Sequence, residues 1–189
     1  MVLALPLAFL SVTTSVAVQV SPDVQTRDGM IQTYYGISTS LNHSDLETLP
    51  LPFKRGVQMS EGFALPTAAV STKNGILVEV VFGRRGHFIS MKTKSLQATD
   101  QRGSRVGDTL SDVQKRWPCG RLYYGNSIEG GHPYASFFTG TNVLLRMSTE
   151  QFDDLLKLKV NAIEIVNFST ADTAGMACSQ KADPYRAGQ

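Results

Sequence analysis

Residues 104–118 read SRVGDTLSDVQKRWP, and this stretch decides the fold prediction. Leu110, Val113 and Trp117 recur at the i, i+3 and i+7 spacing that places apolar side chains on one helical face. Pro118 ends the pattern, because proline has no N–H to donate to a helical ladder. The stretch therefore predicts a short helix that packs this apolar face against the rest of the protein.

The segment at 41–53, LNHSDLETLPLPF, follows the same plan of a polar cap, a short helical pattern and a terminating proline. Asn42 or Ser44 can cap this first helix by accepting bonds from free backbone N–H groups. Asp108 or Thr109 can do the same for the later one. The two segments together indicate an internal duplication of the chain.

Sequence rich in β-forming residues follows each helical segment. NGILVEVVF (74–82) aligns with TNVLLRMS (141–148), and FISMKTKS (88–95) aligns with AIEIVNFS (162–169). Apolar and polar residues alternate in 88–95, which is the period-two pattern of a sheet with one solvated face. The glycines of GRRG (83–86) predict a hairpin turn. We also expect an opening strand at 30–35, a hairpin over 136–145 and a third helix over 150–158.

These patterns predict an α+β protein. We expect two related strand–helix–strands halves, about 30–95 and 88–169, with helices packed on one face of an antiparallel sheet. The 189 residues suit a single domain, placed at 29–179. A leader at 18–28 precedes it, and a flexible tail at 180–189 follows it.

Residues 1–17 have the character of a secretory signal peptide. They are uncharged and largely apolar, and Ser15 and Ala17 are small residues at the positions that a signal peptidase reads. The apolar part is too short to span a hydrocarbon core of about 30 Å comfortably. The usual basic residue at the start is missing, so a retained anchor and an ordinary buried segment are the alternatives. We expect a periplasmic or secreted protein without a transmembrane span once the signal is removed.

Cysteine usage agrees with export. Cys119 and Cys178 are the two cysteines of the chain. A pair in an exported protein favours a disulfide between them. The alternative is two separate buried thiols.

The pattern in 104–118, followed by a cysteine and then by strands, resembles the YfeY-type envelope proteins, which are sigma-E-regulated lipoproteins of unknown function. The resemblance covers about 35–169 and implies a duplicated half-domain with a cysteine pair in its second half. It implies no activity, because none is assigned to the family. This chain has no lipid-attachment cysteine, and Cys178 lies further along than the family pattern places it. Similar repeats in secreted β-lactamase inhibitors and outer-membrane assembly lipoproteins are an analogy of fold alone.

Composition and motifs argue against several function classes. The formal net charge is only +2, and no long basic run occurs, so we expect no nucleic-acid partner. Nucleotide-binding, zinc-protease and serine-hydrolase motifs are missing from the sequence. His43, His87 and His132 are scattered, whereas a zinc site needs three or four converging ligands. We therefore expect no metal, no cofactor and no enzymatic activity.

Two features are candidates for binding. Arg84 and Arg85, with His87 nearby, can grip a carboxylate or phosphate from the hairpin turn, although a charged turn that blocks edge pairing is the alternative. Tyr123 and Tyr124 point to opposite faces of any strand, so one of them is expected at the surface, where tyrosine favours binding. The alternative is that these aromatic residues belong to the core and the sheet surface.

The most economical interpretation is an exported, non-catalytic binding or structural module of the cell envelope. Its partner would be an envelope protein or an anionic envelope component. A secreted inhibitor or regulator of an enzyme is the first alternative, and an enzyme with an unrecognised site is the second.

Overall fold

The computed structural model describes residues 23–60, 62–126, 133–148 and 155–167. Within these ranges the chain is built mainly from strands, which form two antiparallel sheets. The predicted opening strand at 30–35 is confirmed and is the central strand of the smaller sheet. The strands of that sheet are β1 (Val24–Arg27), β2 (Met30–Tyr34) and β3 (Ile37–Ser38).

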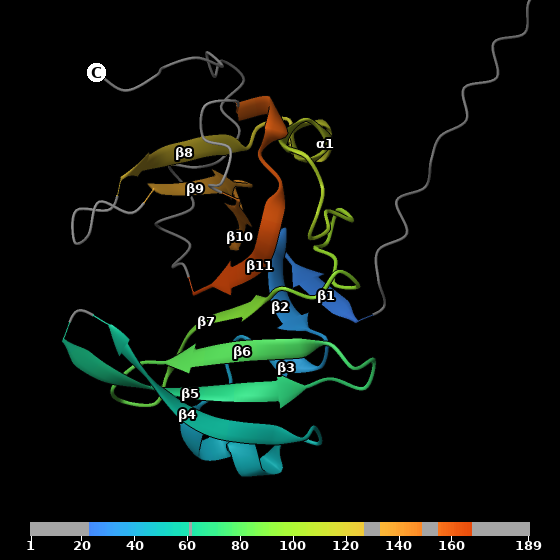
Figure 1. Cartoon of the computed structure of the whole chain (residues 1–189). Coiled ribbons are helices and arrows are strands. Elements are labelled where there is room, and N and C mark those ends of the chain that lie inside the picture. Colours follow the sequence, from blue (N-terminus) through green and yellow to red (C-terminus); the bar gives the residue numbers. More distant parts are fainter. Residues whose placement is uncertain (1–22, 61, 127–132, 149–154, 168–189) are drawn as a thin grey trace, which may run out of the picture.

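The larger sheet has eight strands in the order β4-β5-β6-β7-β11-β10-β9-β8. It consists of two four-strand meanders that meet in the middle, where β7 pairs with β11 and Met91 lies opposite Ile165. Figure 1 shows this sheet from β4 at the bottom of the view to β8 at the top. Its strands are β4 (Phe53–Ser60), β5 (Phe63–Ser71), β6 (Leu77–Phe82), β7 (Phe88–Thr93), β8 (Arg121–Asn126), β9 (Pro133–Phe138), β10 (Val143–Met147) and β11 (Val160–Val166).

One short helix precedes each meander. The first is the 3₁₀ helix η1 (His43–Thr48), and the second is the α-helix α1 (Leu110–Arg116). Thr109 is the cap of α1: its hydroxyl accepts from the Asp112 N–H, and the Asp112 carboxylate accepts from the Thr109 N–H. Trp117, at the end of the helix, is buried together with the apolar face of α1, as the spacing predicts.

The α+β prediction is wrong, because the described chain is mostly β. α1 is the single α-helix in the described ranges, while η1 and η2 (Leu155–Lys157) are short 3₁₀ turns. Pro50 and Pro52 follow η1 closely, and proline cannot extend a helical ladder. No layer of helices therefore covers a face of the sheet within the described residues, and the small sheet shares one apolar core with the large one.

The strands β4 and β5 are among those that the sequence does not predict, because neither shows a clean alternation of apolar and polar residues. The interior of β4 is exposed on both sides, so burial imposes no pattern on it. β5 reads FALPTAAVS and carries Pro66, which argues against an internal strand. Pro66 is tolerated because the ladder between β5 and β6 begins only at Thr67, so the missing N–H removes no bond to β6.

The predicted leader at 18–28 extends too far along the chain. Its last part forms β1, which pairs antiparallel with β2. Asp28 and Gly29 make the turn with φ values of 52° and 76°. A two-residue hairpin of type I′ needs positive φ at both positions, and Asp-Gly is a sequence that supplies it.

Two predicted hairpins are confirmed, and one predicted helix is not. The turn at 83–86 joins β6 to β7, and the hairpin over 136–145 is formed by β9 and β10. The third helix was predicted over 150–158. Residues 149–154 lie outside the described ranges, and the chain then forms η2 and the start of β11.

One face of the large sheet, here called the core face, supplies most of the apolar core. Val80, Met91, Ile165 and Leu145 are fully buried on four successive strands. The small sheet, in blue in Figure 1, contributes Ile31, Tyr34 and Ile37 to the same apolar core. An amide links the two sheets: Asn142, in the turn between β9 and β10, exchanges two 2.8 Å hydrogen bonds with the backbone of β2.

Candidate functional site

The opposite face of the large sheet, here called the outer face, carries polar and aromatic side chains. It is formed by the residues that alternate with the core face along each strand. In β6, for example, the exposed Glu79 lies between Val78 and Val80, which are fully buried. The outer face therefore presents its side chains away from the core.

Four charged side chains of alternating sign cross the outer face, and we call them the charged row: Glu79, Lys92, Glu164 and Arg146. Glu79 lies opposite Lys92, and Lys92 lies opposite Glu164 on the next strand. Lys92 Nζ is 3.5 Å from Glu79 Oε2, and Arg146 Nε is 2.6 Å from Glu164 Oε2. Arg146 also donates to Ser136 Oγ at 3.1 Å, which extends the row to β9.

The charged row contributes little to folding stability. Except for the largely buried Glu164, its members are substantially exposed, and exposed ion pairs are typically worth at most about 1 kcal/mol. Alternating charges at fixed positions nevertheless give the face a pattern that a complementary surface can match.

Three aromatic side chains, which we call the aromatic group, lie at the β8 and β9 end of the outer face: Tyr123, Tyr134 and Phe138. Tyr123 is 50% exposed and meets Phe138 edge to face, with ring centroids 5.9 Å apart. Tyr134 is 44% exposed and lies opposite Gly125, where an added Cβ would stand 3.4 Å from its hydroxyl oxygen. The aromatic group and the charged row meet at Ser136, which lies opposite both Tyr123 and Arg146.

The structure separates the residues that were predicted to bind. Tyr123 lies on the outer face, whereas Tyr124 lies opposite Ala135 on the other side of the sheet, also partly exposed. Arg84, Arg85 and His87 are exposed at the turn from β6 to β7. In the strand order β7, β11, β10 and β9 lie between that turn and β8, so these residues do not form one site.

Sequence reasoning missed the charged row and the place of Tyr134 in the aromatic group. A weak signal for the charged row was present, because Arg146 and Glu164 each stand between apolar residues in a β-pattern. The pairing itself depends on strand register, which joins residues far apart in the chain.

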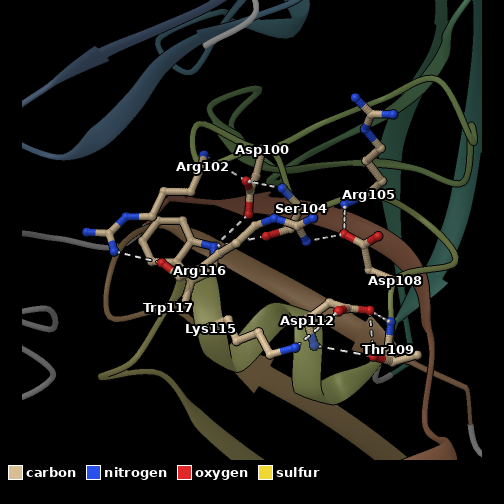
Figure 2. Close-up of polar contacts among 10 residues, drawn as sticks. All are labelled: Asp100, Arg102, Ser104, Arg105, Asp108, Thr109, Asp112, Lys115, Arg116 and Trp117. Atoms are coloured by element: carbon tan, nitrogen blue, oxygen red, sulfur yellow. Dashed lines mark hydrogen bonds and ion pairs between the residues drawn. The ribbon is translucent and has the colours of Figure 1, made fainter. Parts of the chain in front are cut away.

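A second polar cluster lies beside α1 and is drawn in Figure 2. Asp100 accepts hydrogen bonds from the backbone N–H groups of Arg102 and Ser104, each at 2.8 Å, and from Trp117 Nε1 at 2.8 Å. The Arg102 guanidinium lies 4.3 Å from the centroid of the Trp117 ring and donates to the Arg116 carbonyl. These contacts fasten the 100–104 turn to the end of the helix.

Asp100 has the perturbed acidity that often marks a catalytic carboxyl. Burial raises its pKa from the ordinary value, although hydrogen bonds from Ser104, Trp117 and Arg102 oppose this shift. The residue is 0% exposed, and both of its oxygens are engaged by the chain. The geometry therefore gives Asp100 a structural role in holding Trp117.

The remaining predicted site residues are distributed over the fold. Cys119 follows the end of α1, and Cys178 lies outside the described residues, so the disulfide stays a prediction. His43 packs edge-on against Phe82 and lies 2.9 Å from an Arg55 nitrogen. His132 is also outside the described residues. Among those that are described, no three His, Cys, Asp or Glu side chains gather as metal ligands, and no helix is long and apolar enough to cross a membrane.

Comparison with known proteins finds similarity among solved structures but not among sequences. No protein-family model and no curated protein sequence matches the chain. Among solved structures, the chain is similar to the uncharacterized protein yfeY from Escherichia coli, with a TM-score of 0.49 and 14% identity over 70% of this chain and 94% of that one. This is a weak likeness of fold alone, and membership of the YfeY-type family stays a prediction.

Proposed function

We infer that this protein is an exported, non-catalytic binding module of the cell envelope, and that it holds a partner protein on the outer face. The observation that carries the proposal is the aromatic group at the end of the charged row. Tyrosine and arginine dominate the energetics of many protein interfaces, and here Tyr123, Tyr134 and Arg146 surround Ser136 on a rigid sheet.

Other features agree with this function. The signal-like sequence at 1–17 supports export. Asp100, whose carboxyl pKa is raised by burial, is enclosed and occupied by structural contacts. A surface depression lies near Trp117, and Arg102 is the one ionisable residue among those that line it: Thr26, Gly29, Gln101, Arg102, Trp117 and Thr141.

Affinity capture with paired variants tests the proposal. The chain from Val18 onward, which retains every described element, is immobilised and exposed to an envelope extract. The Tyr123→Ala/Tyr134→Ala variant should lose the captured protein, with affinity lower by about 30-fold or more if these residues are hot spots.

Tyr124→Ala is the matched control, because it removes the same side chain from the same strand on the opposite side of the sheet. It should capture the partner as the unchanged protein does. Equal capture by all three proteins would refute binding through the outer face. Turnover of a substrate by the purified protein would refute the non-catalytic part of the proposal.

A further inference from the structure

The hairpin of β4 and β5 extends past the end of β6. β5 pairs with β4 along its whole length from Phe63, but with β6 only from Thr67 onward. We call the part beyond β6, residues 57–60 and 62–66, the hairpin tip; Figure 1 shows it projecting from the lower part of the large sheet. A two-stranded hairpin without a third strand is only marginally stable in water, so this projection is an unusual feature.

The hairpin tip exposes apolar side chains on both of its faces. Val57 and Met59 are 71% and 67% exposed on one face, and Phe63 is 49% exposed on the other. Exposed apolar side chains that gather at one place on a protein often mark an interaction site.

Two arginines adjoin the hairpin tip. The guanidinium of Arg84, in the turn from β6 to β7, lies 3.3 Å from the centroid of the Phe63 ring. Arg85 is exposed beside it, and neither arginine pairs with a carboxylate among the described residues. Among the described residues of the hairpin tip none is acidic, so the two arginines make this end of the described sheet positively charged.

We propose that the hairpin tip and the Arg84–Arg85 turn together dock on a bilayer that contains anionic phospholipids. Lipid surrounds a segment that enters a bilayer, so it can cover the apolar side chains on both faces of the hairpin tip. A groove on a partner protein would cover only one of these faces. Guanidinium groups bind phosphate by two parallel hydrogen bonds, which complements the apolar contact. The free strand edges of the hairpin tip need water, so docking stops at the headgroup layer.

This site goes beyond the proposed function and does not depend on it. The hairpin tip belongs to β4 and β5, at the end of the strand order opposite to the aromatic group of β8 and β9. A protein docked on a membrane by the hairpin tip can therefore still present its outer face to a partner.

Vesicle sedimentation tests the proposal. The chain from Val18 onward is mixed with vesicles of phosphatidylcholine alone, or of phosphatidylcholine with one-third phosphatidylglycerol, at low and at high salt. We expect sedimentation with the anionic vesicles that weakens as salt rises, and little with the neutral ones. Equal behaviour with both vesicles, whether bound or unbound, would overturn the proposal and leave the hairpin tip as a site for a protein.

Four variants assign the effect to the site. Arg84→Ala/Arg85→Ala should reduce the partition constant about 30-fold, and Arg85→Ala alone, which keeps the Phe63 contact, about 5-fold. Val57→Ser/Met59→Ser should weaken the binding that persists at high salt. Arg27→Ala/Arg105→Ala is the charge-matched control, since both arginines are exposed and lie in β1 and before α1. If the control pair lost as much binding as the turn pair, general charge would explain the attraction and the proposal would fail.

Discussion

Replacement of Asn142 by alanine should loosen the connection between the two sheets. The Asn142 Oδ1 accepts from the Ile31 N–H and its Nδ2 donates to the Ile31 carbonyl, both at 2.8 Å, across 111 residues of sequence. β3 pairs with β2 only at Thr33 and Tyr34, so at Ile31 the amide takes the place of a neighbouring strand. Both partners are buried.

The size of the effect follows from the two backbone groups that lose their partners. A buried unpaired donor or acceptor costs roughly 1–3 kcal/mol, so Asn142→Ala should lower the free energy of unfolding by about 4 kcal/mol if both groups stay dry. A water that enters the vacated space would reduce the loss to about 2 kcal/mol. Asn142→Asp keeps the size but places an oxygen against the Ile31 carbonyl, so it should destabilise at least as strongly.

Urea unfolding followed by tryptophan fluorescence measures this loss directly. Trp117 is the single tryptophan of the chain and is buried, so its emission shifts when the core opens. Asn74→Ala is the control, because the exposed Asn74 amide bonds only to Asp23 at the surface, and it should change stability by no more than about 0.5 kcal/mol. A loss below about 1 kcal/mol for Asn142→Ala would refute the reasoning that the amide acts as a substitute strand.

Three further changes test other contacts. Asp100→Asn should lower the free energy of unfolding by about 1–3 kcal/mol in the same assay, because both Asp100 oxygens accept hydrogen bonds. In either orientation of the asparagine amide, its NH₂ group would face a donor, either Trp117 Nε1 or the backbone N–H groups. Unchanged stability would contradict the role given to Asp100. Hydrogen bonds with Thr109 lower the pKa of Asp112, so this stabilising contribution is complete above the ordinary carboxyl value of 3.8 and is lost as the pH falls through the lowered pKa. In acid titrations, the unchanged protein should accordingly lose its stability advantage over the Asp112→Asn variant only below that pH. An advantage that persists to the most acid pH would count against this role of the Asp112 carboxylate. Gly120→Ala should lower the free energy of unfolding by about 1–3 kcal/mol, since an added Cβ would overlap the Phe137 ring and stand 2.8 Å from the Phe138 carbonyl oxygen. A melting temperature equal to that of the unchanged protein would disprove this close approach.

The helix α1 could be predicted because all of its signals are local. The spacing of Leu110, Val113 and Trp117 and the cap at Thr109 lie within a few residues of one another. The hairpin of β1 and β2 was equally accessible, because Asp28-Gly29 is a strong turn signal, but the stretch was assigned to a leader.

The β4 strand and the charged row could not be predicted in the same way. The hairpin tip is exposed on both faces, so no alternation of apolar and polar residues marks its strands. The pairing of Arg146 with Glu164 and the position of Tyr123 opposite Ser136 depend on the register of strands from distant parts of the chain. The sequence could predict that a tyrosine of this strand lies at the surface, but not which side chains of other strands lie next to it.

The antiparallel contact between β7 and β11 gives the large sheet a symmetric strand order. Each is the last strand of its own meander, and two copies of a single meander would pair in this way about a two-fold axis. The two meanders therefore turn their first strands, β4 and β8, to opposite ends of the sheet. One chain can in this way offer two different surfaces at a distance from each other: the hairpin tip at one end and the aromatic group at the other.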